Sequence, residues 1–355
     1  MKSLENIKLM SDLHLEESVE LGKDSGRGNL LGIEPYIAAS DYASAQTLQS
    51  KLDGYVSEAK HRGWLNEKTI ILLPEYFGTW LVLANEPESV FQTDKLAIAE
   101  QRLVLRHIFG FLWQLIIAKE KGKLEAAVFR LKSQVMADTY NSVLSNIAKN
   151  YCITVIGGST VLPAPQVRDG KLTAGKGPLY GVTPVYGPDG RAYSNLVLKA
   201  YPTTEELPFM TPASSKALSA FDTPAGKLGI LICADSWFPD CYERLKELSV
   251  ELIAIPSNGG DPVVWDQPWG GYSGWPTPSD VDASDVKKLT EGDAWRKYAL
   301  AGRIGMTKAR YGSNIFIRGQ LLDMTGGGGR TTIVKNGEVL RDKNLTGASL
   351  VNLWL

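Results

Sequence analysis

A chain of 355 residues with 44% hydrophobic residues holds enough apolar material for a large buried core, as in a globular protein. Its 38 basic and 39 acidic residues leave a formal net charge of -1, which argues against nucleic acid or an anionic membrane as a partner. Three cysteines form no disulfide framework, so we expect free thiols and a cytoplasmic, reducing location.

The amino-terminal residues contain no apolar stretch of signal-peptide length, and we interpret residues 1–28 as a short polar extension. Within it, IKLMSDLHLE (7–16) is similar to the Asp-x-His opening of metallophosphoesterases, which bind two metal ions. The later metal-ligand motifs of those enzymes are missing from the sequence. Metallophosphoesterase activity is therefore kept only as an alternative, and we expect no metal site.

Strands and helices alternate along the chain. Short apolar runs of strand length occupy 69–75, 152–158, 228–233 and 251–257. Apolar residues at helical spacing occupy 44–63, 139–150 and 239–249. Because no composition break or linker separates these elements, we predict α/β layering in one domain that spans residues 1–355.

Two segments are typical of β-hairpins. Residues 184–199 contain the turn sequence Pro188-Asp189-Gly190, and residues 330–340 contain Asn336-Gly337. Since a hairpin joins antiparallel strands, we predict mixed sheets instead of purely parallel ones.

Two other segments stand out by composition. The apolar stretch 103–118 is interrupted by Arg106 and His107, which favours a buried helix over a membrane span. Residues 258–294 form a long loop rich in Gly, Pro and Trp, and loops of this length in compact domains are often functional.

Cys233 ends one of the predicted strands and faces the turn before a helix that begins near Pro239. Ligand sites in α/β sheets lie at such strand ends. A nucleophilic thiol needs a base or a positive neighbour, because its ordinary pKa leaves it protonated at neutral pH. The three histidines lie in no context that suggests an active site, which favours a carboxylate base. Glu75, which follows a buried strand and a proline, is the candidate.

Lys199 closes the second strand of the first predicted hairpin, and Glu205 and Glu206 follow it. Each of these residues alone could be an ordinary surface residue. In this order, however, the stretches TIILLPE, RAYSNLVLKAYPTTEEL and GILICADSWFPD resemble the nitrilase or carbon-nitrogen hydrolase superfamily, which uses a Glu-Lys-Cys triad. The resemblance covers the chain from about residue 30 to 355.

The resemblance implies a four-layer α-β-β-α sandwich with two mixed sheets and outer helices. It implies catalytic roles for Glu75, Lys199 and Cys233, with Glu206 favoured over Glu205 as the second glutamate. The enzyme would hydrolyse non-peptide C–N bonds of an amide, a nitrile or an N-carbamoyl compound through a thioester, without a cofactor. It also implies a homodimer or a higher homo-oligomer.

Two departures from the family pattern bear on specificity. The separation of Glu75 from Lys199 predicts an insertion near 100–135. Trp237 stands where many amidase-like members carry an arginine that can hold a substrate carboxylate, so we expect a neutral substrate. The candidate substrate-binding residues are Tyr76, Trp80, Ala234, Trp237 and Asn258. A catalytically inactive, nitrilase-like binding protein is the remaining alternative.

Overall fold

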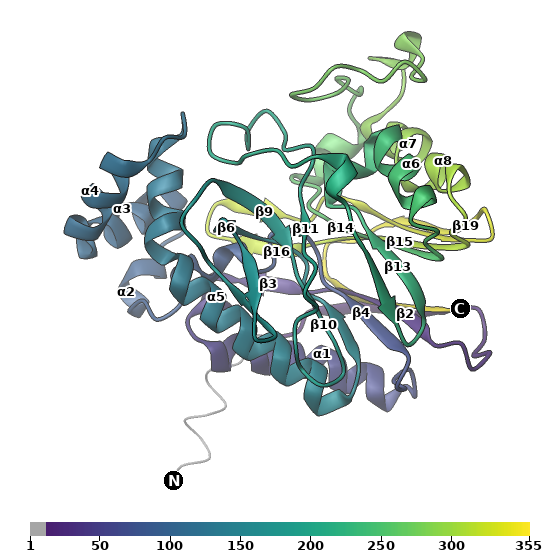
Figure 1. Cartoon of the computed structure of the whole chain (residues 1–355), viewed down its shortest axis with the longest axis horizontal. Helices are drawn as coiled ribbons and strands as arrows, with labels where there is room; N and C mark the ends of the chain where they lie inside the picture. The colour runs from purple at the N-terminus through teal and green to yellow at the C-terminus, as the bar shows by residue number, and fades with distance from the viewer. Residues whose placement is uncertain (1–11) are drawn as a thin grey trace.

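The computed structural model describes residues 12–355 and shows a mixed α/β protein (Figure 1). Residues 1–11, which include part of the predicted extension and the first five residues of the stretch IKLMSDLHLE, lie outside the described residues, whereas Asp12 and His14 of that stretch are described. Two six-stranded mixed sheets dominate the described part of the chain, and β14 of the second lies against β4 of the first.

The first sheet contains parallel and antiparallel neighbours. Its strands, in spatial order, are β1 (Leu15–Leu21), β20 (Ala348–Trp354), β2 (Asn29–Glu34), β4 (Thr69–Leu72), β5 (Thr154–Ile156) and β10 (Val185–Tyr186). The edge strand β1 comes from the segment interpreted as an extension, and it pairs in parallel with the carboxyl-terminal strand β20.

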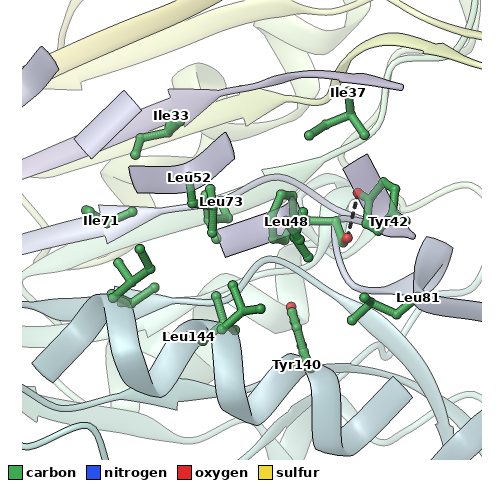
Figure 2. Close-up of a cluster of buried hydrophobic side chains, with 14 of the residues drawn as sticks. Ile33, Ile37, Tyr42, Leu48, Leu52, Ile71, Leu73, Leu81, Tyr140 and Leu144 are labelled. Atoms are coloured by element: carbon green, nitrogen blue, oxygen red, sulfur yellow. Dashed lines mark hydrogen bonds between the residues drawn. The ribbon is translucent and has the colours of Figure 1, made fainter. Parts of the chain in front are cut away.

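One face of this sheet is covered by α1 (Ala45–His61) and α5 (Lys123–Tyr151). Successive side chains of a strand point to opposite faces. Accordingly, Ile71 packs in the cluster that contains α1 and α5, whereas Ile70 and Leu72 pack in the cluster of the second sheet. Figure 2 shows the first cluster, with Leu144 of α5 among its side chains.

The second sheet is also mixed. Its strands, in spatial order, are β12 (Ala220–Thr223), β13 (Gly226–Ile230), β14 (Leu252–Ser257), β15 (Tyr311–Phe316), β18 (Arg330–Lys335) and β19 (Glu338–Asn344). Its core cluster also takes in side chains from α6 (Pro239–Glu247), α7 (Glu291–Tyr298) and α8 (Leu300–Arg303). These helices lie at the upper right of Figure 1.

Shorter elements complete the described chain. Three-stranded sheets are formed by β11 (Val197–Leu198), β9 (Leu179–Thr183) and β6 (Thr160–Pro163), and by β17 (Met324–Gly326), β16 (Arg318–Leu321) and β3 (Tyr36–Ala38). A small hairpin consists of β7 (Gln166–Arg168) and β8 (Lys171–Thr173). The remaining α-helices are α2 (Glu88–Phe91), α3 (Leu96–Arg106) and α4 (Ile108–Ile117).

The predicted strands and helices are present, and one of the two predicted hairpins is confirmed. Asn336 and Gly337 adopt φ angles of 53° and 82° between the antiparallel strands β18 and β19, as a tight hairpin turn requires. The hairpin prediction for 184–199 is wrong in its pairing. The turn forms, but the second strand, β11, pairs with β9, and only the bridge between Tyr186 and Ala192 joins the two arms of the turn.

The prediction of a buried helix over 103–118 is also wrong. The segment divides at His107, where α3 ends and α4 begins, and both His107 and Arg106 pair with Glu86. Most large side chains of α4 are exposed, including Phe109 at 87%. Figure 1 shows why: α3 and α4 lie at one end of the molecule, away from the two large sheets that would bury an apolar helix.

Throughout residues 12–355, no helix combines the length and the apolar character that crossing a membrane requires.

Candidate active site

A buried lysine lies between two buried glutamates. Glu75 follows β4 after a Leu-Pro step, and Lys199 directly follows β11. The Lys199 Nζ donates to Glu75 Oε1 at 2.7 Å and to the two Glu206 oxygens at 2.8 and 2.7 Å. All three residues are 3% exposed or less, so this charge cluster is shielded from water.

Additional donors hold the Glu206 carboxylate. Its Oε2 accepts from the backbone N–H of Thr203 at 2.7 Å, and its Oε1 accepts from the Tyr76 hydroxyl. Glu205, by contrast, is exposed. Of the two candidate second glutamates, Glu206 is therefore the one that Lys199 contacts.

Cys233 begins a short 3₁₀-helix, Cys233–Trp237, just after β13. Its φ is 47°, and Tyr76, next to Glu75, has a φ of 61°. Such left-handed residues other than glycine cost about 1–3 kcal/mol each and are concentrated at functional sites. The Cys233 thiol interacts with the Glu75 carboxylate, and its Sγ lies 3.8 Å from the backbone oxygen of Asn258.

The buried Asp235 ties the cysteine segment to the lysine segment. Its carboxylate accepts from the backbone N–H of Ile232 at 3.1 Å, and from those of Ala200 at 3.0 Å and Tyr201 at 2.8 Å. Because Ile232 precedes Cys233 and Ala200 follows Lys199, these bonds hold the two segments side by side.

Burial and neighbouring charges set the protonation states in this cluster. Burial, aided by the nearby Glu75 carboxylate, raises the pKa of Cys233 well above its ordinary value, so the thiol is protonated at rest. Burial works against the charged form of Lys199, but Glu206 and Glu75 outweigh it and raise the lysine pKa. The lysine is therefore cationic.

The two glutamates differ although both pair with Lys199. Burial raises the pKa of Glu75, and the repulsion of Glu206 adds to this effect, while Lys199 opposes it. At Glu206, Lys199 and the Tyr76 hydroxyl outweigh burial and lower the pKa. Glu206 is thus the permanent anion beside the lysine, and Glu75 is the better proton acceptor.

The first prediction concerns stability. Lys199→Met removes the cation from between Glu75 and Glu206 and is expected to lower the free energy of unfolding by about 3–5 kcal/mol, because it leaves buried charge uncompensated. Urea unfolding at neutral pH measures this loss. The matched control is Lys343→Met, which breaks an exposed ion pair with Glu17 and should cost less than about 1 kcal/mol. Equal losses in the two variants would contradict the assignment.

Two cavities adjoin the cluster, and both include Asn258. The smaller, of about 200 Å³, contains Cys233, Ala234 and Trp237. Trp265 and Trp269 of the long loop also line it, whereas Trp275 instead donates to the Pro202 carbonyl at 2.7 Å. The larger cavity, of about 350 Å³, contains Tyr76 and Trp80. All five candidate substrate-binding residues therefore line one cavity or both.

Several residues that line the smaller cavity were not named as candidates from the sequence, among them Tyr272, Glu291 and Trp295. Tyr272 packs edge-on against Trp237, and so does Trp295. Glu291 and Trp295 lie on α7, far from Cys233 in the sequence, and carry no motif of their own. Tyr272 and Glu291 belong to the segment 258–294 already marked as a functional candidate, which was their only signal in the sequence, and Trp295 lies just beyond it.

Within residues 12–355, no group of three or more His, Cys, Asp or Glu side chains is placed to hold a metal ion. The two candidate metal ligands of the Asp-x-His sequence contact each other: Asp12 Oδ1 accepts a hydrogen bond from the backbone N–H of His14 at 3.2 Å.

No protein-family model matches the sequence, and no curated protein matches it either. Solved structures do match. One is a double mutant of the amidase from Nesterenkonia sp. AN1 in complex with acrylamide, with a TM-score of 0.52 and 13% identity over 94% of this chain and 93% of that chain. Another is a mutant of the Nesterenkonia AN1 amidase from the nitrilase superfamily, with a TM-score of 0.51 and 13% identity over 93% and 92%.

A third structure, of the same amidase, carries the product of acrylamide addition at its active-site cysteine. It matches with a TM-score of 0.50 and 13% identity, over 92% of this chain and 93% of that chain. At such identities the likeness concerns the fold. The chain accordingly has a fold similar to that of nitrilase-superfamily amidases over more than nine-tenths of its length.

Proposed function

We propose that the protein is a cysteine-dependent hydrolase of non-peptide C–N bonds that acts on a small amide. The observation that carries the proposal is the buried cluster of Cys233, Lys199, Glu75 and Glu206 at the ends of strands, beside two cavities. The fold agrees with it, since the similar structures are amidases and one of them reacts at an active-site cysteine. Nitriles and N-carbamoyl compounds are further substrate classes within the same proposal.

In the first half of the reaction, Glu75 takes the proton of the Cys233 thiol, and Sγ attacks the carbonyl carbon of the amide. The negative charge that develops on the carbonyl oxygen is stabilised by the Lys199 ammonium and by the backbone N–H of Ala234. One such donor is typically worth about 3 kcal/mol. The tetrahedral intermediate then loses its amine, which takes up the proton from Glu75, and a thioester remains on Cys233.

In the second half, Glu75 takes a proton from water, and the resulting hydroxide attacks the thioester carbon. The C–S bond breaks, the carboxylic acid leaves, and the proton returns to the thiolate. Glu206 acts as a positioning residue, because its two contacts with Lys199 keep the ammonium between the carboxylates.

The test of this function is the release of ammonia or amine from a panel of amides, nitriles and N-carbamoyl compounds by the purified chain. Turnover of at least one class that Cys233→Ala loses supports the proposal. Turnover that the substitution leaves intact, or that needs an added divalent metal ion, contradicts it. Metal-dependent hydrolysis of a phosphoester by the same preparation would favour the metallophosphoesterase alternative.

We further propose a neutral substrate. Trp237 offers apolar surface and a single N–H, but no cation, to the group beside the scissile bond. Glu291 in the same cavity would repel a substrate carboxylate when ionised. Both residues line the cavity that contains Cys233. The absence of a cation at Trp237 and the repulsion by Glu291 therefore both disfavour an anionic amide.

The second prediction tests this preference. In Trp237→Arg, kcat/KM for an ω-carboxylate amide relative to a matched neutral amide is expected to rise by about 10-fold or more, because a charge-assisted hydrogen bond is worth about 1.5–3 kcal/mol. Trp237→Leu is the control, since it removes the indole without adding charge and should keep the neutral preference. A wild-type preference for the carboxylate amide, or an unchanged ratio in the arginine variant, would refute the proposal.

Three further features belong to this proposal. We propose that the two large sheets and the helices outside them form the four-layer α-β-β-α sandwich. We also propose that the chain is one domain with an insertion near 100–135. The three free cysteines support a cytoplasmic location. The exposed apolar face of α4 supports a homodimer or higher homo-oligomer, and a single-chain mass in light scattering would exclude it.

A further inference from the structure

The larger cavity is lined mainly by apolar side chains and has no assigned role in the reaction above. Its volume of about 350 Å³ lies within the range of small-molecule sites. Its apolar wall is formed by Leu83, Leu96, Ala99, Leu103, Val128 and Phe129. Such a wall favours a hydrocarbon group, because it removes apolar surface from water and offers few hydrogen bonds.

This cavity reaches the reactive cluster at two points. Tyr76, which lines it, adjoins Glu75 in the chain and donates its hydroxyl to Glu206. Asn258, which lines both cavities, lies with its backbone oxygen 3.8 Å from Cys233 Sγ. A substrate whose scissile carbonyl carbon meets the thiol can therefore extend into this space.

A buried threonine also lines this space. Thr79 lines the cavity and is only 7% exposed, and its Oγ1 has no hydrogen-bond partner among residues 12–355. Leaving such a group unpaired costs about 1–3 kcal/mol. The Thr79 backbone N–H donates to the Tyr76 carbonyl at 2.9 Å, so the hydroxyl lies one turn from the reactive end.

The opposite end of the cavity opens between α3 and α5. Glu100 of α3 and Glu125 of α5 line it and are both exposed, which marks the opening to solvent. Both lie in the segment 100–135 that the sequence predicts as an insertion, as do Leu103 and Val128. This segment, in which the chain departs from the family pattern, thus supplies five of the residues that line the cavity: Glu100, Leu103, Glu125, Val128 and Phe129.

We propose that this cavity binds an unbranched apolar chain attached to the scissile amide, so that the substrates are amides of medium-length hydrocarbon chains. The inference rests on the proposed function. The chain can belong to the acyl group, as in a primary alkanamide, or to the leaving amine, as in an N-alkyl acetamide. Both place the same hydrocarbon in the same cavity, and the experiment distinguishes them.

The experiment measures kcat/KM for primary amides from acetamide to octanamide, and in parallel for N-alkyl acetamides of equal chain length. Each added CH₂ that becomes buried is expected to raise kcat/KM by about threefold to fourfold until the cavity is full. A rise in just one of the two series shows whether the acyl group or the leaving amine carries the chain. A flat or falling dependence in both series overturns the inference.

A matched pair of variants locates the effect. Val128→Trp places a large side chain in the cavity and should bring the ratio of octanamide to acetamide kcat/KM close to one. Val135→Trp is the control, because it lies two helical turns along α5, is also half-buried, and lines no part of this cavity. It should keep the wild-type ratio. An equal fall in both variants overturns the inference.

Binding separates this inference from the proposed function. Calorimetric titration of Cys233→Ala with octanamide and with acetamide does not depend on turnover. Tighter binding of octanamide that Val128→Trp removes supports the apolar subsite even if no amide is hydrolysed. Equal affinity for the two amides overturns the subsite, even if hydrolysis by the wild-type chain confirms the enzyme.

Discussion

Cys233→Ala is expected to lower kcat for the best amide by a factor on the order of 10⁴ or more, because it removes the only nucleophile in the account. The fold should persist. The substitution removes one sulfur atom from a side chain that already borders a cavity, so thermal unfolding should change little. Steady-state rates and a thermal melt of the same preparation measure the two effects.

The other cysteines supply the controls for this substitution. Cys152 is exposed, and Cys241 is buried on α6. Cys152→Ala should leave kcat unchanged. Cys241→Ala is expected to lower stability through lost packing, but the folded fraction should keep its rate. A loss in either control as large as that in Cys233→Ala would contradict the assignment of the nucleophile.

Glu75→Gln is expected to lower kcat by a factor of about 10²–10⁴ with little change in KM, because it removes a general base while keeping the side-chain volume. Lys199 keeps Glu206 as its ionic partner in this variant, so the protein should still fold. Glu205→Gln is the matched control. Because Glu205 is exposed, this substitution should leave kcat unchanged. A near-normal rate in Glu75→Gln would show that another group takes the thiol proton.

The same residue governs the acidic limb of the pH profile. Glu75 must be ionised to accept a proton, and burial raises its pKa above the ordinary 4.5. The rate should therefore fall as the pH decreases through a value above 4.5, and the wild-type kcat/KM profile measures that midpoint. In Glu75→Gln the residual rate should lose this limb. An unchanged limb in the variant would assign the titration to a different group.

The clustering of Glu75, Lys199, Glu206 and Cys233 was predictable in part from the sequence, whereas their proposed roles stay predictions. A strand followed by Pro-Glu, a strand followed by Lys, and a strand ending at Cys each predict one side chain at a strand end, where ligand sites of α/β sheets lie. The strands concerned, β4, β11 and β13, belong to three different sheets, so the packing of the sheets brings the side chains together. Lys199 and Glu206 are seven residues apart, so their pairing is nearly local. The contact between Lys199 and Glu75, by contrast, spans 124 residues and was expected only through the family resemblance.

The predictions that were wrong depended on long-range packing. A turn sequence determines where the chain reverses, but it does not determine which strand edge the next residues meet, so β11 was paired with the wrong partner. The apolar residues of 103–118 indicated burial, yet the sequence does not state whether a core lies beside them, and α4 is exposed. Trp295 and Glu291 reach the Cys233 cavity only through the packing of α7.

The central claim is that a thioester forms on Cys233, and mass spectrometry of the intact protein tests it most directly. The protein is incubated with each amide, nitrile and N-carbamoyl compound of the panel and quenched in acid during turnover. We expect an added mass equal to that of the acyl group of the productive substrate less one hydrogen atom, because the acyl group replaces the thiol hydrogen. The adduct should be absent in Cys233→Ala and lost on treatment with hydroxylamine. Turnover without any such adduct under conditions that trap thioesters, or an adduct that persists in Cys233→Ala, would contradict it.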